Sequence, residues 1–184
     1  TSGLGVYKEL VIGLPALYED EIISYQPWLF VDSEVPVTNG REVWGYPKKI
    51  ADIEFINDRN MFAASYERGG VEVLRTNMEK TDHIGTEELP FDPPELKSAA
   101  RKRIPSAPNG EPPAIDRVVM GKMRDIDVKW AMKGPAEVNF NKSAPDPIYI
   151  FEPVSEPEGY LFDMSWVLET AEEGVLKVFD EYKP

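Results

Sequence analysis

Short apolar segments separated by turn residues constrain the fold of this chain more than any other feature of its sequence. The segments are rich in β-branched and aromatic residues, which favour strands. They lie at residues 10–12, 22–25, 28–31, 53–56, 61–66, 70–75, 115–123, 125–132, 136–140 and 148–154. Turn signals such as Asn57-Asp58-Arg59-Asn60 and Gly69-Gly70 separate them. This spacing predicts an antiparallel meander.

One hairpin is specified in more detail, between Ile53 and Arg75. Strands that flank a tight turn pair with each other, and residues two apart in a strand share a face. Phe55, Phe62 and Tyr66 are therefore expected to line one face of the hairpin.

Two later segments are predicted to lie outside the sheet strands. Residues 90–113 are rich in proline and polar side chains, and within them 95–103 are expected to form a short polar helix or an extended surface loop. Between Trp166 and Phe179 apolar residues recur at helical spacing with acidic residues between them, which predicts an amphipathic C-terminal helix packed on the sheet. Gly174 within that helix would cost about 1 kcal/mol.

These patterns predict a mainly β fold of the α+β class. A length of 184 residues suits one domain over residues 1–184. An α/β barrel of eight strands needs about 250 residues and alternating strand and helix periods. The chain has neither, so this common scaffold for lysine chemistry is excluded.

The charge of the chain limits its partners. It carries 33 acidic and 20 basic residues, a formal net charge of -13. Such a charge repels phosphate backbones and anionic membrane surfaces, so we expect no nucleic-acid or membrane partner. No apolar run approaches the roughly 20 residues that a membrane helix needs. The basic cluster Arg101-Lys102-Arg103 is expected to be solvated or salt-bridged in so acidic a chain.

Several kinds of chemistry are excluded by composition. The chain has no cysteine, which excludes disulfides and thiolate sites and is compatible with the cytoplasmic location that we expect. His83 is the one histidine, and we expect it on a surface loop. The sequence shows neither a glycine-rich phosphate loop nor a cluster of metal ligands, so we expect no cofactor and no metal.

The strongest candidate for chemistry is a pair of adjacent lysines, Lys48 and Lys49, that follows Tyr46-Pro47. A lysine amine attacks a carbonyl only when neutral, and an ordinary pKa of about 10.4 leaves roughly one molecule in a thousand neutral near pH 7. Burial can depress a lysine pKa by about 3 to 5 units. A second cation at about 6 Å contributes about 2 units.

Geometry also separates these two causes. Consecutive residues of a strand project to opposite faces, so Lys49 should point away from the amine of Lys48. We therefore expect desolvation to be the larger cause and Lys49 to act as an auxiliary charge. The alternative from the residues alone is that both lysines lie in a solvated turn.

The motifs around these lysines resemble those of the acetoacetate decarboxylase family. The run Gly-Arg-Glu-x-x-x-Tyr-Pro-Lys-Lys occupies residues 40–49, and Thr-Ser-Gly-Leu-Gly-x-Tyr-x-Glu occupies residues 1–9. A third similar piece, Met-Arg-Asp-Ile-Asp-Val-Lys-Trp, occupies residues 123–130 and is followed by Gly134-Pro135. The resemblance thus extends over most of the chain in the same order.

The resemblance implies a function for three residues. By position in the motifs, Lys48 forms a Schiff base, Lys49 perturbs it, and Glu9 handles protons in the active site. The lowered pKa of the lysine is a known property of this family, and only the ranking of its causes comes from the residues. The resemblance also implies an antiparallel barrel- or cone-like sheet with flanking helices, and assembly into a homo-oligomer.

Four further residues are candidates around this site. Tyr46 and Trp28 are candidates for the pocket wall, or for plain core. Arg41 and Glu42 are expected to support the lysine strand structurally, by pairing with each other or with neighbours. Family members carry several tens of residues before the first motif, including an active-site arginine that has no counterpart in this sequence. Recognition of a substrate carboxylate therefore stays open.

The function expected first is the decarboxylation of a small β-keto acid, such as acetoacetate, to a ketone and CO2. One alternative is an aldolase-dehydratase that uses the same imine on pyruvate-like keto acids. Another is a noncatalytic small-molecule binding domain with the same fold.

Overall fold

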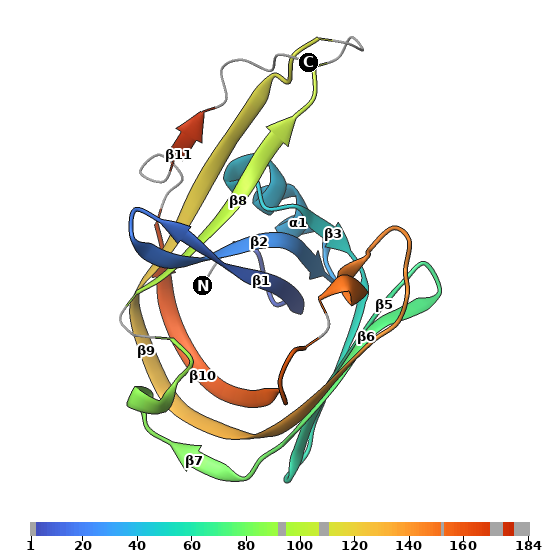
Figure 1. Cartoon of the computed structure of the whole chain (residues 1–184), viewed down its shortest axis with the longest axis vertical. Helices are drawn as coiled ribbons and strands as arrows, with labels where there is room; N and C mark the ends of the chain where they lie inside the picture. The colour runs from blue at the N-terminus through green and yellow to red at the C-terminus, as the bar shows by residue number, and fades with distance from the viewer. Residues whose placement is uncertain (1–2, 92–94, 107–110, 152, 170–174, 179–184) are drawn as a thin grey trace. The chain divides into compact units, whose positions relative to one another are not determined.

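Strands make up most of the computed structural model, which describes residues 3–91, 95–106, 111–151, 153–169 and 175–178 (Figure 1). The chain divides into two compact units. The first comprises residues 1–50, 95–125 and 166–184, and the second comprises 51–94 and 126–165. The single domain expected over residues 1–184 stays a prediction.

In the first unit, strand β2 (Glu21–Val31) is the centre of the part that carries the lysine pair. It pairs with β1 (Glu9–Tyr18) in antiparallel fashion, and with β3 (Lys48–Ile50) and β8 (Leu96–Ile104) in parallel fashion. Strand β8 pairs in turn with the beginning of β9 (Ile115–Phe140), and β11 (Val175–Val178) pairs with the same part of β9.

A helical segment joins β2 to β3. Helix α1 (Glu34–Asn39) continues directly into a π-helical turn, η1 (Gly40–Trp44). Gly45 ends this turn at φ 78°, in the left-handed region that glycine adopts at little cost. The chain can therefore leave the helix sharply and enter β3 only three residues later.

The second unit contains a meander of β4 (Asp52–Asn57), β5 (Met61–Arg68) and β6 (Val71–Glu79). Strand β6 pairs with the later part of β9, which also pairs with β7 (Asp82–Ile84). Strand β10 (Glu158–Leu168), which also pairs with β9, belongs to this unit up to residue 165. Two short 3-10 turns complete the unit, η2 (Thr86–Glu88) and η3 (Ile148–Ile150).

Local turn chemistry explains the meander. Gly69 and Gly70 both have positive φ, as a two-residue hairpin turn requires, and they place Arg68 opposite Val71. Between β4 and β5 the Asp58 carboxylate accepts the N–H groups of Asn60 and Met61 at 2.9 and 2.7 Å.

The predicted hairpin face is confirmed. The register pairs Asn57 with Phe62, Phe55 with Ala64 and Ile53 with Tyr66, which puts the three aromatic residues on one face. The rings of Phe55 and Phe62 lie 5.6 Å apart.

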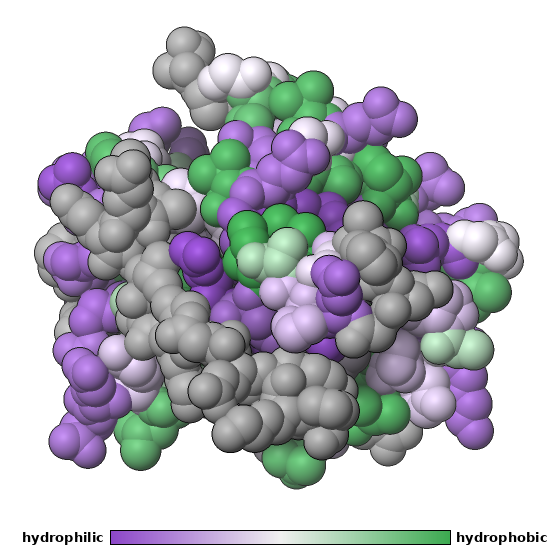
Figure 2. Space-filling model, turned by 90° about the horizontal axis from the view of Figure 1, so that it is seen from above, coloured by the Kyte–Doolittle hydropathy of each residue, from purple (hydrophilic) through white to green (hydrophobic). Residues whose placement is uncertain are grey.

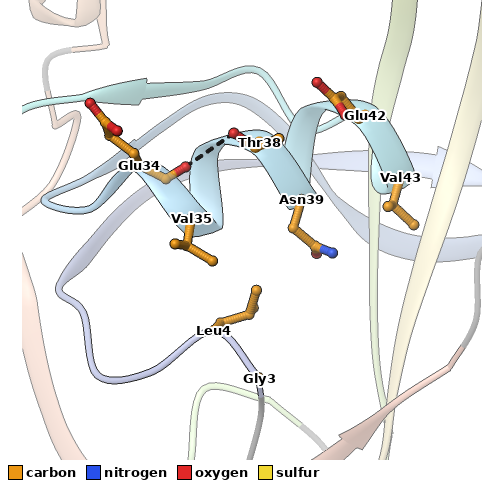
Figure 3. Close-up of a pocket in the computed structure, with 8 residues that line it drawn as sticks. All are labelled: Gly3, Leu4, Glu34, Val35, Thr38, Asn39, Glu42 and Val43. Atoms are coloured by element: carbon orange, nitrogen blue, oxygen red, sulfur yellow. Dashed lines mark hydrogen bonds between the residues drawn. The ribbon is translucent and has the colours of Figure 1, made fainter.

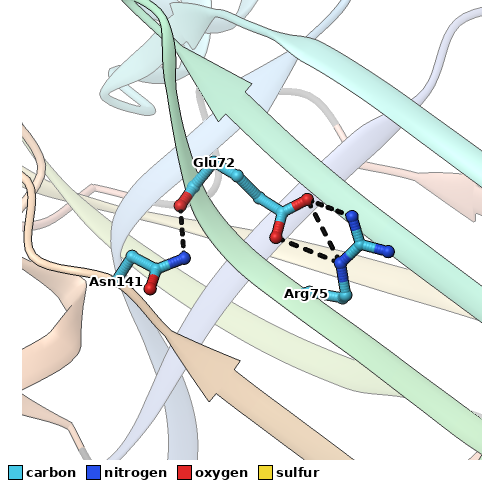
Figure 4. Close-up of polar contacts among 3 residues, drawn as sticks. All are labelled: Glu72, Arg75 and Asn141. Atoms are coloured by element: carbon cyan, nitrogen blue, oxygen red, sulfur yellow. Dashed lines mark hydrogen bonds and ion pairs between the residues drawn. The ribbon is translucent and has the colours of Figure 1, made fainter.

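The loop after β9 is tied back to β6. The Asn141 amide donates to the Glu72 carbonyl at 2.8 Å, while the Glu72 carboxylate binds Arg75 (Figure 4). Asn141 begins the sequence Asn-Lys-Ser, and its amide is thus part of the fold.

Apolar side chains form the interior of each unit. In the first unit Leu29, Phe30, Val31 and Ala100 are at most 2% exposed. In the second unit the most buried apolar residues include Tyr66, Val73 and Ile148. On the face shown in Figure 2, apolar residues occur in small groups among hydrophilic ones.

The mainly β fold is confirmed, but two sequence predictions were wrong. Residues 95–103 were expected to form a helix or loop, yet most of them form β8, because the small residues Ser98, Ala99 and Ala100 are buried in a strand between β2 and β9. The described part of the expected C-terminal helix is also strand: Trp166 to Leu168 end β10, and Val175–Val178 form β11. Pairing with β9 prevails there over helical spacing.

Other boundaries also differ. The three strands expected over 115–140 are one continuous strand, β9, with Asp125 at φ 54°. Residues 148–150 form η3 instead of a strand. His83 lies in β7, not in a loop, and is exposed as expected. Closure of the sheet into a barrel or cone stays a prediction.

Candidate active site

The paired strands bring Lys48 and Glu9 to one face of β2. In the register Leu29 is opposite Lys48 and Val31 is opposite Glu9, so the lysine and the glutamate flank β2 on its two edges. Two inter-strand spacings separate them, about 9.6 Å of backbone distance that long side chains can span. Lys48 Nζ lies 2.8 Å from Glu9 Oε1.

This ion pair is largely withdrawn from water. The Lys48 side chain is 9% exposed and that of Glu9 is 24% exposed. Beneath them, Leu29 and Val31 are at most 2% exposed. A buried lysine is rare and is normally paired, as here. The solvated-turn alternative for Lys48 is therefore wrong.

Gly40 provides space for the lysine. A Cβ at this position would lie 2.6 Å from Lys48 Cδ and 2.8 Å from Cε. The backbone of η1 thus packs directly on the aliphatic stem of Lys48, and a larger residue would displace it.

Hydrogen bonds fix the chain around β3. The N–H of Tyr46 donates to the Gly40 carbonyl at 3.0 Å, and the N–H of Lys48 donates to the Tyr46 carbonyl at 2.7 Å. Arg41 Nη1 donates to the Lys48 carbonyl at 3.3 Å. Lys102 Nζ donates to the carbonyls of Glu42 and Val43, the latter at 3.0 Å. Arg41 and the Glu42 backbone thus both hold the segment that presents the lysine.

Lys49 occupies the opposite face of β3, as expected for consecutive strand residues. It is paired with Phe30, and its Nζ lies 5.9 Å from the centre of the Phe30 ring. Lys48 Nζ instead lies 5.4 Å from the centre of the Tyr7 ring. The two amines therefore have different surroundings.

Tyr7 belongs to this site, although the sequence reasoning did not single it out. Its ring lies against Lys48 Nζ, and its hydroxyl interacts with the Glu9 carboxylate. Burial, followed by the charge of Glu9 and a hydrogen-bonding interaction with it, raises the pKa of Tyr7 to about 12. The available signal was its place in the upstream motif, two positions before Glu9.

The two proposed wall residues differ in position. Tyr46 is buried and packs with Leu29, Ala100 and Trp44, and its hydroxyl lies 2.9 Å from Ser98 Oγ. The pKa of Tyr46 is raised overall. Burial is the largest cause, the hydrogen bond with Ser98 opposes it, and the nearby charge of Glu9 adds to it. Trp28 pairs with Ile12 and shares the Phe30 face of β2, so the structure does not bring it to Lys48 and Glu9.

A cavity of about 780 Å³ lies beside the segments that carry the site. Figure 3 shows Val35, Asn39 and Val43 on the side of the helical segment that faces Leu4. The lining comprises Gly3, Leu4, Glu34, Val35, Thr38, Asn39, Glu42 and Val43. The cavity is thus lined by the segment that precedes Tyr7 and Glu9 and by the helical segment that leads to Lys48.

The basic cluster on β8 is salt-bridged, as expected. Arg101 donates two hydrogen bonds of 2.7 Å to Asp116, and Arg103 lies 3.6 Å from the same carboxylate. The hydrogen bonds from Arg101 lower the pKa of Asp116. Among the described residues, no group of three or more His, Asp or Glu side chains could hold a metal ion. None of the described helices is long and apolar enough to span a membrane.

Comparison with known proteins agrees with the motifs. Residues 1–174 match the family model described as acetoacetate decarboxylase (ADC). The chain is 27% identical over 152 residues to acetoacetate decarboxylase 2 of Mesorhizobium japonicum, which covers 80% of this chain and 56% of that protein. The chain thus spans little more than half the length of this curated relative.

Two solved structures show the same fold. The crystal structure of acetoacetate decarboxylase from Legionella pneumophila is similar with a TM-score of 0.87 at 22% identity, over 97% of this chain and 70% of that chain. The enduracididine biosynthesis enzyme MppR, complexed with pyruvate, is similar with a TM-score of 0.74 at 18% identity, over 88% of this chain and 64% of that chain.

Proposed function

Because the chain belongs to the acetoacetate decarboxylase family, we propose that it forms a Schiff base through Lys48 and decarboxylates a small β-keto acid such as acetoacetate. The observation that carries this proposal is the buried Lys48 amine, held 2.8 Å from the Glu9 carboxylate. In this position the Glu9 carboxylate can exchange a proton with the amine that adds to the ketone.

The chemistry needs no group beyond the amine and a proton carrier. Neutral Lys48 Nζ adds to the ketone carbon, and the carbonyl oxygen leaves as water, which gives a cationic iminium. The iminium stands β to the carboxylate, so the electron pair of the breaking C–C bond moves toward nitrogen as CO2 departs. The resulting enamine takes a proton at carbon, and water then releases the ketone and the free amine.

Glu9 is the proton carrier in this proposal. Its carboxylate can accept the proton that the Lys48 ammonium must lose, and it can return a proton to the enamine carbon. Lys49 faces the opposite side of β3, so its contribution is an auxiliary charge at most. Tyr46 contributes the wall of the pocket near Glu9, and Arg41 and Glu42 hold the lysine segment.

Borohydride trapping tests the central step. Incubation with acetoacetate and borohydride should leave a stable adduct that peptide mass spectrometry locates on Lys48. Lys48→Ala should abolish the adduct. Lys49→Ala, a matched control on the other face of β3, should retain it. A stable adduct located on any other residue contradicts the proposal.

A second candidate is condensation of pyruvate with an aldehyde followed by dehydration. It is favoured by the fold shared with MppR, which has been solved with pyruvate and with the condensation product of pyruvate and imidazole 4-carboxaldehyde. The same iminium supports both reactions. Release of CO2 from acetoacetate, measured beside condensation of pyruvate with that aldehyde, distinguishes them.

The proposal extends to assembly and location. We propose a homo-oligomer in the cytoplasm, in which neighbouring copies cover exposed apolar residues such as Leu17 and Ile22, which are 74% and 78% exposed in the single chain. Sedimentation of the purified protein should show a species larger than one chain of 20.8 kDa. A single-chain species at micromolar concentration contradicts the assembly.

A further inference from the structure

We propose that Tyr7 is a positioning residue of the active site, which acts by holding the Glu9 carboxylate against the Lys48 nitrogen. The inference rests on the proposed function, since it assigns Tyr7 to the proton steps of that reaction. Tyr7, Glu9 and Lys48 all belong to the first unit and are in mutual contact.

Tyr7 contacts both partners of the ion pair. Its ring lies 5.4 Å from Lys48 Nζ, and its hydroxyl interacts with the Glu9 carboxylate that lies 2.8 Å from the same nitrogen. This ring distance is within the roughly 6 Å at which an aromatic face attracts a cation. The hydroxyl therefore fixes the carboxylate while the ring covers the nitrogen that becomes the iminium.

Core packing does not explain the position of Tyr7. The residues around it, Gly5 and Val6, are exposed, and Gly5 has φ 73°. Tyr7 nevertheless turns toward Lys48 and is only partly exposed. An aromatic side chain that turns inward directly after two exposed residues indicates a specific use of that side chain.

The backbone next to Tyr7 is fixed by hydrogen bonds. The N–H of Lys8 donates to Asp32 Oδ1 at 2.8 Å, and the N–H of Asp32 donates to the Lys8 carbonyl at 3.3 Å. These two bonds fasten the peptide between Tyr7 and Glu9 to the end of β2. The hydroxyl also stays protonated, because burial and Glu9 raise the pKa of Tyr7 to about 12. It is therefore a hydrogen-bond donor throughout the physiological range of pH.

The proton steps require that Glu9 be held accurately. A carboxylate that carries protons must reach the nitrogen and then the enamine carbon, and a misplacement of about 1 Å can cost about 100-fold in rate. One Glu9 oxygen faces Lys48 Nζ at 2.8 Å. The Tyr7 hydroxyl restrains the rotation that would take that oxygen away.

The test compares Tyr7→Phe with a matched control, Tyr160→Phe. Tyr160 also donates its hydroxyl to a glutamate, Glu158, but in the second unit. Tyr7→Phe keeps the ring over Lys48 and removes only the hydroxyl. We expect kcat for acetoacetate to fall about tenfold or more, in the range of a general acid–base contribution. Borohydride should still trap Lys48 to the wild-type extent, and Tyr160→Phe should resemble wild type in both measurements.

A double-mutant cycle with Glu9→Gln shows whether Tyr7 acts through Glu9. If it does, Tyr7→Phe should change kcat by less than about twofold in the Glu9→Gln background. A purely structural contribution would instead lower kcat by the same factor in both backgrounds. An unchanged kcat in Tyr7→Phe, additive effects in the cycle, or loss of the Lys48 adduct in Tyr7→Phe would each overturn the inference.

Failure of the proposed function gives a different result. If wild-type protein forms no adduct with acetoacetate, the decarboxylase proposal fails while the contact can still be examined. The ionisation of Tyr7, isolated as the difference in tyrosinate absorbance between wild type and Tyr7→Phe, should then fall below about pH 12 in Glu9→Gln. An ionisation unchanged by Glu9→Gln would remove the Tyr7–Glu9 contact on which the inference depends.

Discussion

At the residue scale, the space around Lys48 depends on the absence of a side chain at Gly40. Gly40 has ordinary helical φ and ψ of -61° and -41°, so its backbone would accept alanine. The restriction is steric, because a Cβ would lie 2.6 Å from Lys48 Cδ. A substitution at this residue therefore reports on the packing of the lysine stem alone.

We expect Gly40→Ala to move the Lys48 amine away from Glu9 and to lower the free energy of unfolding by about 1 to 3 kcal/mol, as for an overpacked core. Borohydride trapping and urea unfolding measure the two effects. Gly3→Ala is the control, since a Cβ at that residue would have no other atom within 4 Å. Wild-type trapping by Gly40→Ala would contradict the crowding argument.

The raised pKa of Tyr7 predicts how the free energy of unfolding changes in alkaline solution. Its pKa in the folded protein, about 12, is above the ordinary value of 10.0, so the folded state keeps this proton to higher pH than the unfolded chain. This contribution to stability is complete below about pH 10 and is lost as the pH rises toward about 12. The difference in unfolding free energy between wild type and Tyr7→Phe should therefore be constant up to about pH 9 and then decline. Urea unfolding at several pH values checks this, and a constant difference up to about pH 11 would argue against it.

At the element scale, strands bounded by local turn residues could be predicted from the sequence, and strands that depend on pairing with distant residues could not. Gly69-Gly70 and Asp58 determine their turns through their own backbone and side-chain chemistry, so the strands on either side could be predicted from the sequence. Strand β8 could not, because what makes residues 96–104 a strand is pairing with β2 and β9, which are distant in sequence. The strand structure of residues 166–168 and 175–178 could not be predicted for the same reason, since both strands pair with β9.

The candidate site was likewise predictable only where the signal was local in sequence. Lys48, Lys49 and Glu9 stand in recognisable motifs, and alternation along a strand was enough to predict that the two lysines face apart. The contact of Lys48 with Glu9 requires the order β1, β2, β3 in space, which no local pattern contains. Trp28 was a candidate for the pocket wall or for plain core, and its place relative to Lys48 depends on the pairing of β2 with β1 and β3, which is likewise nonlocal.

A buried ion pair connects two elements of the second unit. Asp146, fully buried before η3, binds Arg68 at the end of β5 with a distance of 2.7 Å between Nη1 and Oδ2. We expect Asp146→Asn to lower the free energy of unfolding by about 2 to 3 kcal/mol, because the charged hydrogen bond is lost in a buried place. Asp163→Asn is the control, since Asp163 and Lys129 form an exposed pair at 3.5 Å and such pairs contribute little. Equal urea midpoints for the two variants would contradict this account.

At the scale of the whole molecule, the net charge of -13 opposes the approach of an anionic keto acid. Salt shortens the range of this repulsion, with a Debye length of about 30 Å at 0.01 M and about 8 Å at 0.15 M. We expect kcat/KM for acetoacetate to rise about twofold or more between these ionic strengths, with kcat unchanged. Trapping of a neutral ketone such as acetone should not respond to salt. A fall in kcat/KM with salt would show that local cations dominate over the net charge.

The alternation of the lysines along β3 has a consequence for how the site tolerates change. A strand only three residues long can slip by one position against its neighbour, and such a slip exchanges the inward and outward sets of side chains. Here the exchange would turn Lys49 inward in place of Lys48, so that a primary amine still faces the carboxylate. The hydrogen bond from Arg41 to the Lys48 carbonyl opposes such a slip, so it helps to determine which of the two amines faces Glu9.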